Sequence, residues 1–181
     1  MSRQIPGRGN GDHIDASRAQ WARELPDLDT APMTVLGRAR RVVLQSRPPI
    51  ETIFARHGLD AGEFDVIATL LRSGPPYALR PTELYQSLMI SSGGLTDRLN
   101  RLRKAGLITR SPSPEDGRSL LVELSPQGGA TAEAAFREDM ALEARLLDAL
   151  DPADRAALEQ LLRKLGDAIT AALQTEATDA D

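Results

Sequence analysis

The hydrophobic residues of this chain recur every three or four positions along most of its length, which is the spacing of amphipathic helices. Helical patterns cover residues 16–25, 34–45, 50–57, 61–73, 81–88 and 95–105, and two longer stretches follow residue 125. Only residues 107–110 and 119–124 are patterned as strands, separated by a loop rich in Pro, Ser and Gly. These patterns predict a mainly α fold with one small β-hairpin, an α+β class.

The central feature is the stretch from Leu79 to Leu107, in which two short helical patterns are joined by a tight turn. The second of these helices has an apolar stripe of Leu95, Leu99 and Leu102. Its opposite face is polar and basic, with Asp97, Asn100, Arg101 and Lys104. A short helix that is buried on one side and basic on the other suits the major groove of DNA.

The boundaries of this second helix are also marked in the sequence. Ser91 or Ser92 is a candidate N-cap, and Gly93 and Gly94 would allow backbone N–H groups to approach a phosphate closely. Gly106 is a typical residue at a helix C-terminus. The hairpin that follows is then expected to form the wing of a winged helix-turn-helix.

The flanking segments are predicted to be helical as well. We expect disorder over residues 1–15, a first helix from about Ala16 with Ser17 as N-cap, and a break or kink at Pro48 and Pro49. Asp60 is expected to cap a helix whose apolar stripe is Phe64, Ile67, Ala68 and Leu71, with Asp65 at its edge. Residues 74–81 are expected to be a rigid connector, and Pro81 fits the first position of the next helix.

Two long helices complete the chain. The first is expected to start at Ser125 and Pro126 and to point four side chains inward: Phe136, Met140, Leu147 and Leu150. The second starts at Asp151 and Pro152 and carries a regular apolar stripe of Leu158, Leu161, Leu162, Leu165 and Ile169. That stripe could close the core of the single chain or form a dimer interface.

Charge is distributed unevenly, although the formal net charge of −4 is unusual for a nucleic-acid-binding protein. Residues 97–118 contain six basic side chains and three acidic ones, whereas residues 126–181 contain five basic and twelve acidic ones. One face can therefore meet phosphates while the rest repels them. The absence of cysteine excludes disulfides and thiol-based redox sensing, and without an apolar leader or a membrane-length apolar run we expect a soluble, cytoplasmic protein.

Enzyme chemistry has little support in the sequence. The only two histidines, His13 and His57, form no acid–base pair or metal set, and phosphate-loop and dinucleotide-binding fingerprints are absent. We therefore expect no catalytic residues, no metal site and no cofactor.

The helix-turn-helix LMISSGGLTDRLNRLRKAGLITR, the hairpin EDGRSLLVELSPQG and the flanking helices resemble the MarR family of winged-helix regulators. The resemblance implies a homodimer, formed by N- and C-terminal helices, that binds a pseudo-palindromic operator in double-stranded DNA. Together with the composition of the two ends, it predicts five segments: a disordered tail (1–15), N-terminal helices (16–58), the DNA-binding domain (59–125), C-terminal dimerisation helices (126–174) and an acidic tail (175–181).

Carried over by position, the recognition helix is Ser91 to Lys104 and the wing motif is Asp116-Gly117-Arg118. Where this chain has Gly117, the family often has a second arginine, so the wing loses one cation. The resemblance and the pattern together assign twelve residues to DNA binding: Ser91, Ser92, Gly93, Gly94, Thr96, Asp97, Asn100, Arg101, Lys104, Arg110, Asp116 and Arg118.

Within the family, WARELPDLDT, GEFDVIATLLRSGPPYALRPTEL and SSGGLTDRL resemble the urate-responsive PecS/HucR subgroup. This resemblance implies an effector site of Trp21, Asp65 and Arg98, with Ser73 as a fourth member. Arg98 also has support from helical geometry, because it lies beside the leucine stripe and needs an anionic partner there, either a ligand or a structural carboxylate. A planar anion such as urate could pair with its guanidinium and stack on indole.

The expected function is a repressor that leaves its operator when a small anionic effector such as urate binds. Two alternatives remain open: a regulator of the same type that responds to phenolic acids, and a dimeric helical interaction module without operator binding.

Overall fold

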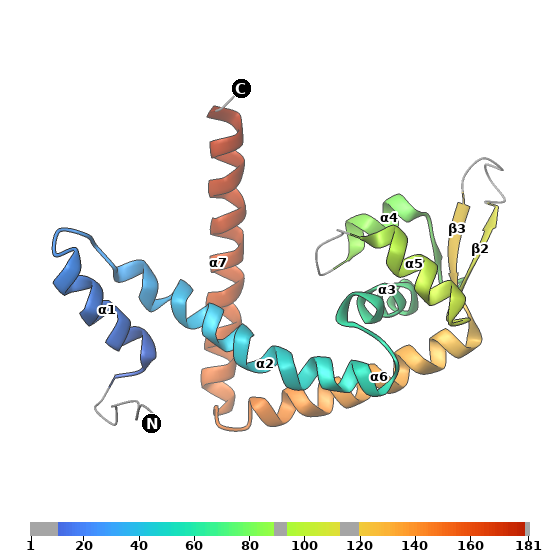
Figure 1. Ribbon diagram of the computed structural model, residues 1–181, viewed down its shortest axis with the longest axis horizontal. Helices are drawn as coiled ribbons and strands as arrows, with labels where there is room; N and C mark the ends of the chain where they lie inside the picture. Colours follow the sequence, from blue (N-terminus) through green and yellow to red (C-terminus); the bar gives the residue numbers. More distant parts are fainter. Residues whose placement is uncertain (1–10, 89–93, 113–119, 180–181) are drawn as a thin grey trace, which may run out of the picture.

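The computed structural model describes residues 11–88, 94–112 and 120–179. The elements are α1 (His13–Glu24), η1 (Ala31–Thr34), α2 (Leu36–Arg56), α3 (Ala61–Arg72), β1 (Ala78–Leu79), α4 (Pro81–Ser87), α5 (Leu95–Lys104), β2 (Ile108–Pro112), β3 (Leu120–Leu124), α6 (Pro126–Leu146) and α7 (Pro152–Asp179). The structure is extended, with a compact α/β unit at one end, the first helix at the other and the long helices α2, α6 and α7 between them (Figure 1). The predicted mainly α class with a β-hairpin is confirmed.

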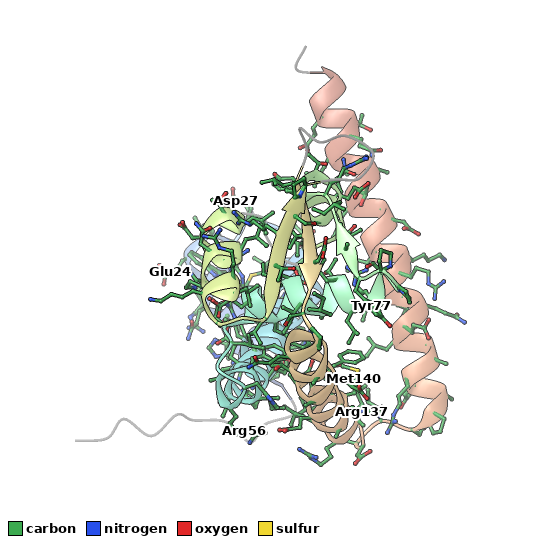
Figure 2. All side chains as sticks on the ribbon, turned by 90° about the vertical axis from the view of Figure 1, so that its right-hand side faces the viewer. Glu24, Asp27, Arg56, Tyr77, Arg137 and Met140 are labelled. Carbon is green, nitrogen blue, oxygen red and sulfur yellow. The ribbon has the colours of Figure 1, made fainter. Side chains whose placement is uncertain are left out.

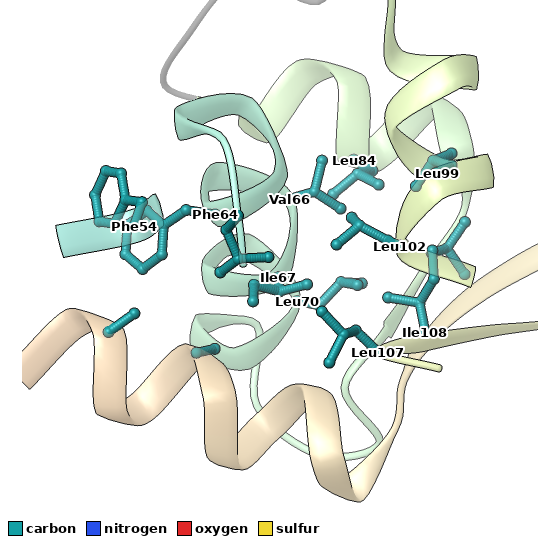
Figure 3. Packing of buried hydrophobic residues seen from close by; sticks show 14 of the residues in the cluster. Phe54, Phe64, Val66, Ile67, Leu70, Leu84, Leu99, Leu102, Leu107 and Ile108 are labelled. Carbon is teal, nitrogen blue, oxygen red and sulfur yellow. The ribbon is translucent and has the colours of Figure 1, made fainter. Parts of the chain in front are cut away.

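Helix α3 is the centre of the hydrophobic core (Figure 3). Eight of its twelve residues are buried, so its buried surface is wider than the single stripe that the sequence predicts. Val66 and Leu70, which lie outside that stripe, are fully buried. Phe64 stacks on Phe54 of α2, with ring centroids 4.0 Å apart and planes 14° from parallel. Asp60 caps the helix as predicted.

The sheet joins the hairpin to the helix-turn-helix. Its strand order is β1-β3-β2, all pairs are antiparallel, and Ile108 lies opposite Leu124 in the β2–β3 register. Strand β1 was not predicted, because it is only two residues long and lies in the segment that the prolines mark as a connector. Pro81 begins α4 as predicted. The sheet therefore fixes the base of the wing against the DNA-binding unit.

The N-terminal helix begins earlier than predicted. Its N-cap is Asp12 rather than Ser17, and Asp12 and Asp15 form a reciprocal capping box. Arg38 of α2 bridges the same two carboxylates at 2.8 Å from each, which fixes α1 to α2. The Ser17 hydroxyl instead donates to the His13 carbonyl within the helix.

Helix α2 continues through Pro48 and Pro49, so of the two predicted outcomes, a break or a kink, the break is wrong. Each proline removes one backbone N–H from the helical hydrogen bonds. The carbonyls that lose a donor belong to Leu44 and Gln45, both exposed, so water can replace the missing donors. The Thr52 hydroxyl donates to the Pro48 carbonyl at 2.9 Å and occupies that group.

Helix α6 begins at Pro126 with Ser125 as its N-cap, as predicted, but buries a different face. Phe136, Met140 and Leu147 are 47%, 38% and 43% exposed, so their predicted inward orientation is wrong for the single chain. The buried face consists of small residues and one acid: Gly128, Ala132, Ala135 and Asp139. Small side chains are required there because α6 packs closely across α3 and the Leu107 carbonyl.

Helix α7 makes the least contact with the rest of the chain. In the side view of Figure 2 it stands apart from the α/β unit, with side chains projecting on all sides. No residue from 152 to 176 is buried. The helix runs to Asp179, beyond the predicted boundary at residue 174. None of the described helices is both long and apolar enough to cross a membrane.

Candidate DNA-binding surface and effector site

Helix α5 presents the polar face that the sequence predicts. Leu99 and Leu102 are buried, and Leu95 is half-buried. Thr96, Asp97, Asn100 and Lys104 are exposed. Gly94 precedes the helix with φ of +75°, and Gly106 follows it with φ of +72°. Both ends therefore use the left-handed backbone region that glycine adopts without steric cost. The N-cap of α5 is Gly94, so the predicted N-cap at Ser91 or Ser92 is wrong. Ser91, Ser92 and Gly93 themselves lie outside the described residues.

The wing is described at its base. Arg110 on β2 lies opposite Val122 of β3 and is half-buried. Ser111, the next residue, donates to the Glu123 carboxylate across the pair. Asp116, Gly117 and Arg118 lie outside the described residues, so the wing motif stays a prediction.

Arg101 has two partners within the chain, which the sequence prediction did not anticipate. Its Nε lies 2.6 Å from Glu63 Oε1, and its Nη2 lies 2.7 Å from Asp60 Oδ2. These contacts, led by the hydrogen bond to Glu63, raise the pKa of the guanidinium above its already high ordinary value. Arg101 is thus a cation at the edge of the recognition helix that already contacts α3.

Arg98 lies against the first turn of α3. A β-carbon at Gly62 would come within 2.6 Å of Arg98 Cζ and 2.9 Å of Cδ, so only glycine leaves room for this side chain. Arg98 is half-buried, as its place beside the leucine stripe predicts, and it has an interaction partner. Asp65, which is buried and also engaged, lies one turn further along α3. The structure therefore brings Arg98 and Asp65 to the same end of α3.

The other two predicted effector residues are elsewhere in the chain. Ser73 caps the far end of α3, where its hydroxyl donates to the Leu70 carbonyl at 2.7 Å. It is about 16 Å along the helix from Gly62, at 1.5 Å per residue. Trp21 is 46% exposed on α1, which lies at the opposite end of the molecule from α5 (Figure 1). A single chain does not assemble the four-residue site.

Sequence reasoning missed Tyr85, an aromatic side chain that is 57% exposed on the first helix of the helix-turn-helix. It lines a surface hollow between α4 and α5 together with Pro81, Leu95 and Thr96. The signal was available, since Tyr85 follows the buried Leu84 and so points away from the core.

Comparison with known proteins places this arrangement in a family. A family model described as "MarR family" matches residues 57–119. The transcriptional regulator PecS of Dickeya dadantii is 37% identical over 146 residues, which cover 81% of this chain and 88% of that protein.

Two solved structures share the fold over most of their length. One is a cysteine-to-serine mutant of MarR from E. coli in complex with operator DNA, with a TM-score of 0.62, 27% identity and coverage of 80% of this chain and 96% of that one. The other is BpsR of Bordetella bronchiseptica, whose DNA binding is regulated by 6-hydroxynicotinic acid, with a TM-score of 0.60, 26% identity and coverage of 75% and 95%. With its winged helix-turn-helix, its recognition helix and these relatives, the chain belongs to the MarR family of transcriptional regulators and is not an enzyme.

Proposed function

We propose that the protein is a homodimeric, DNA-binding repressor that is released from its operator by a small planar anion such as urate. The observation that carries the proposal is the position of two faces of α5. One face is polar and exposed, and Arg98, beside it, lies against Gly62 of α3. A ligand that engages Arg98 therefore acts on the recognition helix directly.

The DNA-binding part of the proposal rests on the exposed face of α5 and on the wing. Asn100 and Lys104 are exposed on α5, which supports contacts from them to base edges and phosphates in the major groove. The wing, with Arg110 at its base, is suited to the adjacent minor groove. The similarity to a MarR structure bound to operator DNA supports the same mode of docking.

The dimer is supported by an apolar groove of about 650 Å³ between α2 and α7. Its lining includes Val42 and Leu161, which are both 63% exposed. Such a surface is typical of a face that another chain covers, and a second copy is the simplest occupant because a twofold interface is self-complementary. The helices that line the groove, α2 and α7, lie between α1 and the α/β unit in Figure 1. A twofold axis at the groove would therefore bring α1 of one chain to the side of its partner's α/β unit.

That geometry bears on the effector site. Asp65 and Arg98 would come from one chain, and Trp21 would come from α1 of the other. The guanidinium would pair with the anion, and the indole would cover its flat face. Release requires the effector to bind the DNA-incompetent arrangement more tightly than the DNA-bound one, because only differential affinity shifts the population.

The experiment is a titration of DNA from upstream of the coding sequence with the protein, with and without urate. We expect sequence-selective, salt-dependent binding by the native protein and weaker binding in urate. Arg98→Ala should still bind the DNA but no longer release it. Arg103→Ala, which removes an exposed arginine from the same helix, is the matched control and should keep the urate response. Normal release by Arg98→Ala would refute the effector site.

A second variant tests the position of Arg98 without removing its charge. Gly62→Ala places a methyl group where the Arg98 guanidinium now lies, and that flexible side chain can move away without disrupting the core. We expect a folded protein with an altered urate response. An unchanged urate response would show that effector binding does not depend on the position of Arg98 against Gly62.

The identity of the effector can be tested with the single tryptophan of the chain. Urate, 6-hydroxynicotinic acid and a phenolic acid are each titrated while Trp21 fluorescence is recorded. The compound that quenches at the lowest concentration, and that loses this effect in Arg98→Ala, is the best match to the site. Quenching that persists in Arg98→Ala would show that Trp21 and Arg98 belong to different sites.

A further inference from the structure

Arg101 is held between two carboxylates that also cap helix α3. Asp60 Oδ1 accepts from the Glu63 backbone N–H at 2.7 Å, and Glu63 Oε2 accepts from the Asp60 backbone N–H at 2.9 Å. The other oxygen of each carboxylate accepts from Arg101. Each acid therefore uses one oxygen to begin α3 and the other to bind the recognition helix.

Glu63 is the stronger of the two anchors. Its side chain is only 11% exposed, whereas that of Asp60 is 54% exposed. An ion pair that is shielded from water on one side is screened less by solvent and salt than a fully exposed one. The guanidinium suits this site because its rigid donors can reach both carboxylates at once, which the compact ammonium of lysine does less well.

Arg98 and Arg101 contact the same turn of α3. They are three residues apart on α5, and Arg98 lies against Gly62, between the two acids in sequence. Leu99 and Leu102 fill the core on the neighbouring side of the helix. The leucines fix the depth of α5, and the arginines fix its rotation and its position along α3.

We propose that Arg101 is a positioning residue, which docks the recognition helix on the capping box of α3 and does not act as a phosphate contact. This inference rests on the DNA binding proposed above. It predicts that the charge of Arg101 contributes to operator affinity through Glu63. The competing possibility is that Arg101 leaves the carboxylates and pairs with a phosphate when DNA binds.

Salt dependence separates the two possibilities. Each lost phosphate contact lowers the slope of log affinity against log salt by about 0.9. Arg101→Gln should lower operator affinity by about three- to tenfold with an unchanged slope, because an ion pair within the protein, not one with DNA, is lost. Lys104→Gln, which removes a cation from the exposed face of the same helix, is the matched comparison and should reduce the slope. If Arg101 docks α5 on the two carboxylates, Arg101→Lys should also weaken operator binding. If Arg101 instead contacts a phosphate, the Arg101→Lys protein should bind the operator almost normally.

For Glu63→Gln, the two possibilities predict changes in operator affinity of opposite sign. Glutamine at this position still completes the capping box, so α3 keeps its N-terminus. Removing a negative charge near DNA ordinarily strengthens binding because phosphate repulsion falls. Docking predicts the reverse, a loss of about three- to tenfold, and predicts that adding Arg101→Gln causes little further loss. Tighter binding by Glu63→Gln, or a reduced salt slope in Arg101→Gln, would overturn the proposal.

A measurement without DNA distinguishes this inference from the proposed function. The urea midpoints of Glu63→Gln, Arg101→Gln and the double variant form a thermodynamic cycle. Docking predicts that the double variant unfolds at a higher urea concentration than the sum of the single shifts implies, whether or not the protein binds the chosen operator. Strict additivity of the two shifts would overturn it.

Discussion

Helices α3 and α7 differ sharply in how they use their hydrophobic residues. Eight of the twelve residues of α3 are buried within the chain, whereas α7 buries none of its residues from 152 to 176. Both carry apolar stripes at helical spacing, so the pattern alone does not distinguish them. The difference shows that α3 builds the core of the single chain, while the apolar face of α7 stays exposed in it. Substitutions in the two helices should therefore affect different equilibria.

The largest effect is expected in the core. Leu70→Ala removes a fully buried side chain from α3 and should lower the free energy of unfolding by about 2 to 5 kcal/mol. Urea unfolding at one fixed protein concentration measures it. Leu161→Ala, which truncates an exposed leucine of α7, is the matched control. If Leu161→Ala lowered the free energy of unfolding of the dissociated chain as much as Leu70→Ala does, α3 and α7 would not differ in their contribution to the core.

A charge on the apolar face of α7 should instead break association. Leu161→Asp places a carboxylate in the groove between α2 and α7 and should weaken dimerisation by about 100-fold or more, since burying an unpaired charge is costly. Gln160→Asp puts the same charge on the opposite side of α7 as a control. Sedimentation velocity reports the mass of each variant. A Leu161→Asp protein that remains dimeric would place the interface elsewhere.

Helix α6, which packs on both α2 and α3, contains a buried acid. Asp139 is 6% exposed, and among the described residues its Oδ1 has no hydrogen-bond partner. Burial, with a smaller contribution from the nearby Glu143, raises its pKa from 3.8 to about 6. Both the folded and the unfolded state are protonated well below pH 3.8, so this acid costs no stability there. The cost grows as the pH rises from 3.8 to about 6 and stays constant at higher pH.

Asp139→Asn tests this dependence. The variant should gain about 1 to 3 kcal/mol relative to the native protein on going from pH 4 to pH 8, because the native carboxylate must ionise while buried. Glu143→Gln removes only the neighbouring charge and should give a smaller change of the same sign. Unfolding midpoints over this pH range give the answer, and a gain that is independent of pH would contradict the raised pKa.

The smallest effect is expected at the N-terminus, far from the core. Asp12→Ala removes the N-cap of α1 and one carboxylate from Arg38, and should destabilise α1 while leaving the core intact. Asp27→Ala, in the exposed loop after α1, is the control and should have little effect. If the backbone amides of α1 lose their protection from hydrogen exchange in Asp12→Ala while those of α3 keep it, the effect is local. Global destabilisation would instead show that α1 belongs to the core.

Local signals in the sequence were sufficient for much of the DNA-binding unit. The N-cap at Asp60, the helix start at Pro81 and the leucine stripe of α5 depend on interactions within a few residues, and each is confirmed. The hairpin and the start of α6 at Ser125 are confirmed for the same reason. Arg98 was also placed correctly, since its position beside the stripe follows from helical geometry alone.

Three of the errors concern contacts between distant segments. The partners of Arg101 lie about forty residues earlier in the chain, and helical periodicity contains no information about them. The buried face of α6 was misjudged because close packing on α3 selects small residues such as Ala132 and Ala135 over larger apolar ones. The separation of Trp21 from Arg98 has the same origin, because it depends on how Arg38 fixes α1 to α2.

The most direct test of this account is the mass of the protein–operator complex by sedimentation equilibrium, measured with operator DNA and with an unrelated duplex of equal length. We predict two chains per operator duplex, no stable complex with the unrelated DNA, and loss of the operator complex in Leu161→Asp. That result would show that operator binding needs both the exposed face of α7 and the recognition helix. Binding of a single chain per duplex with undiminished affinity in Leu161→Asp, or equal binding to both duplexes, would contradict it.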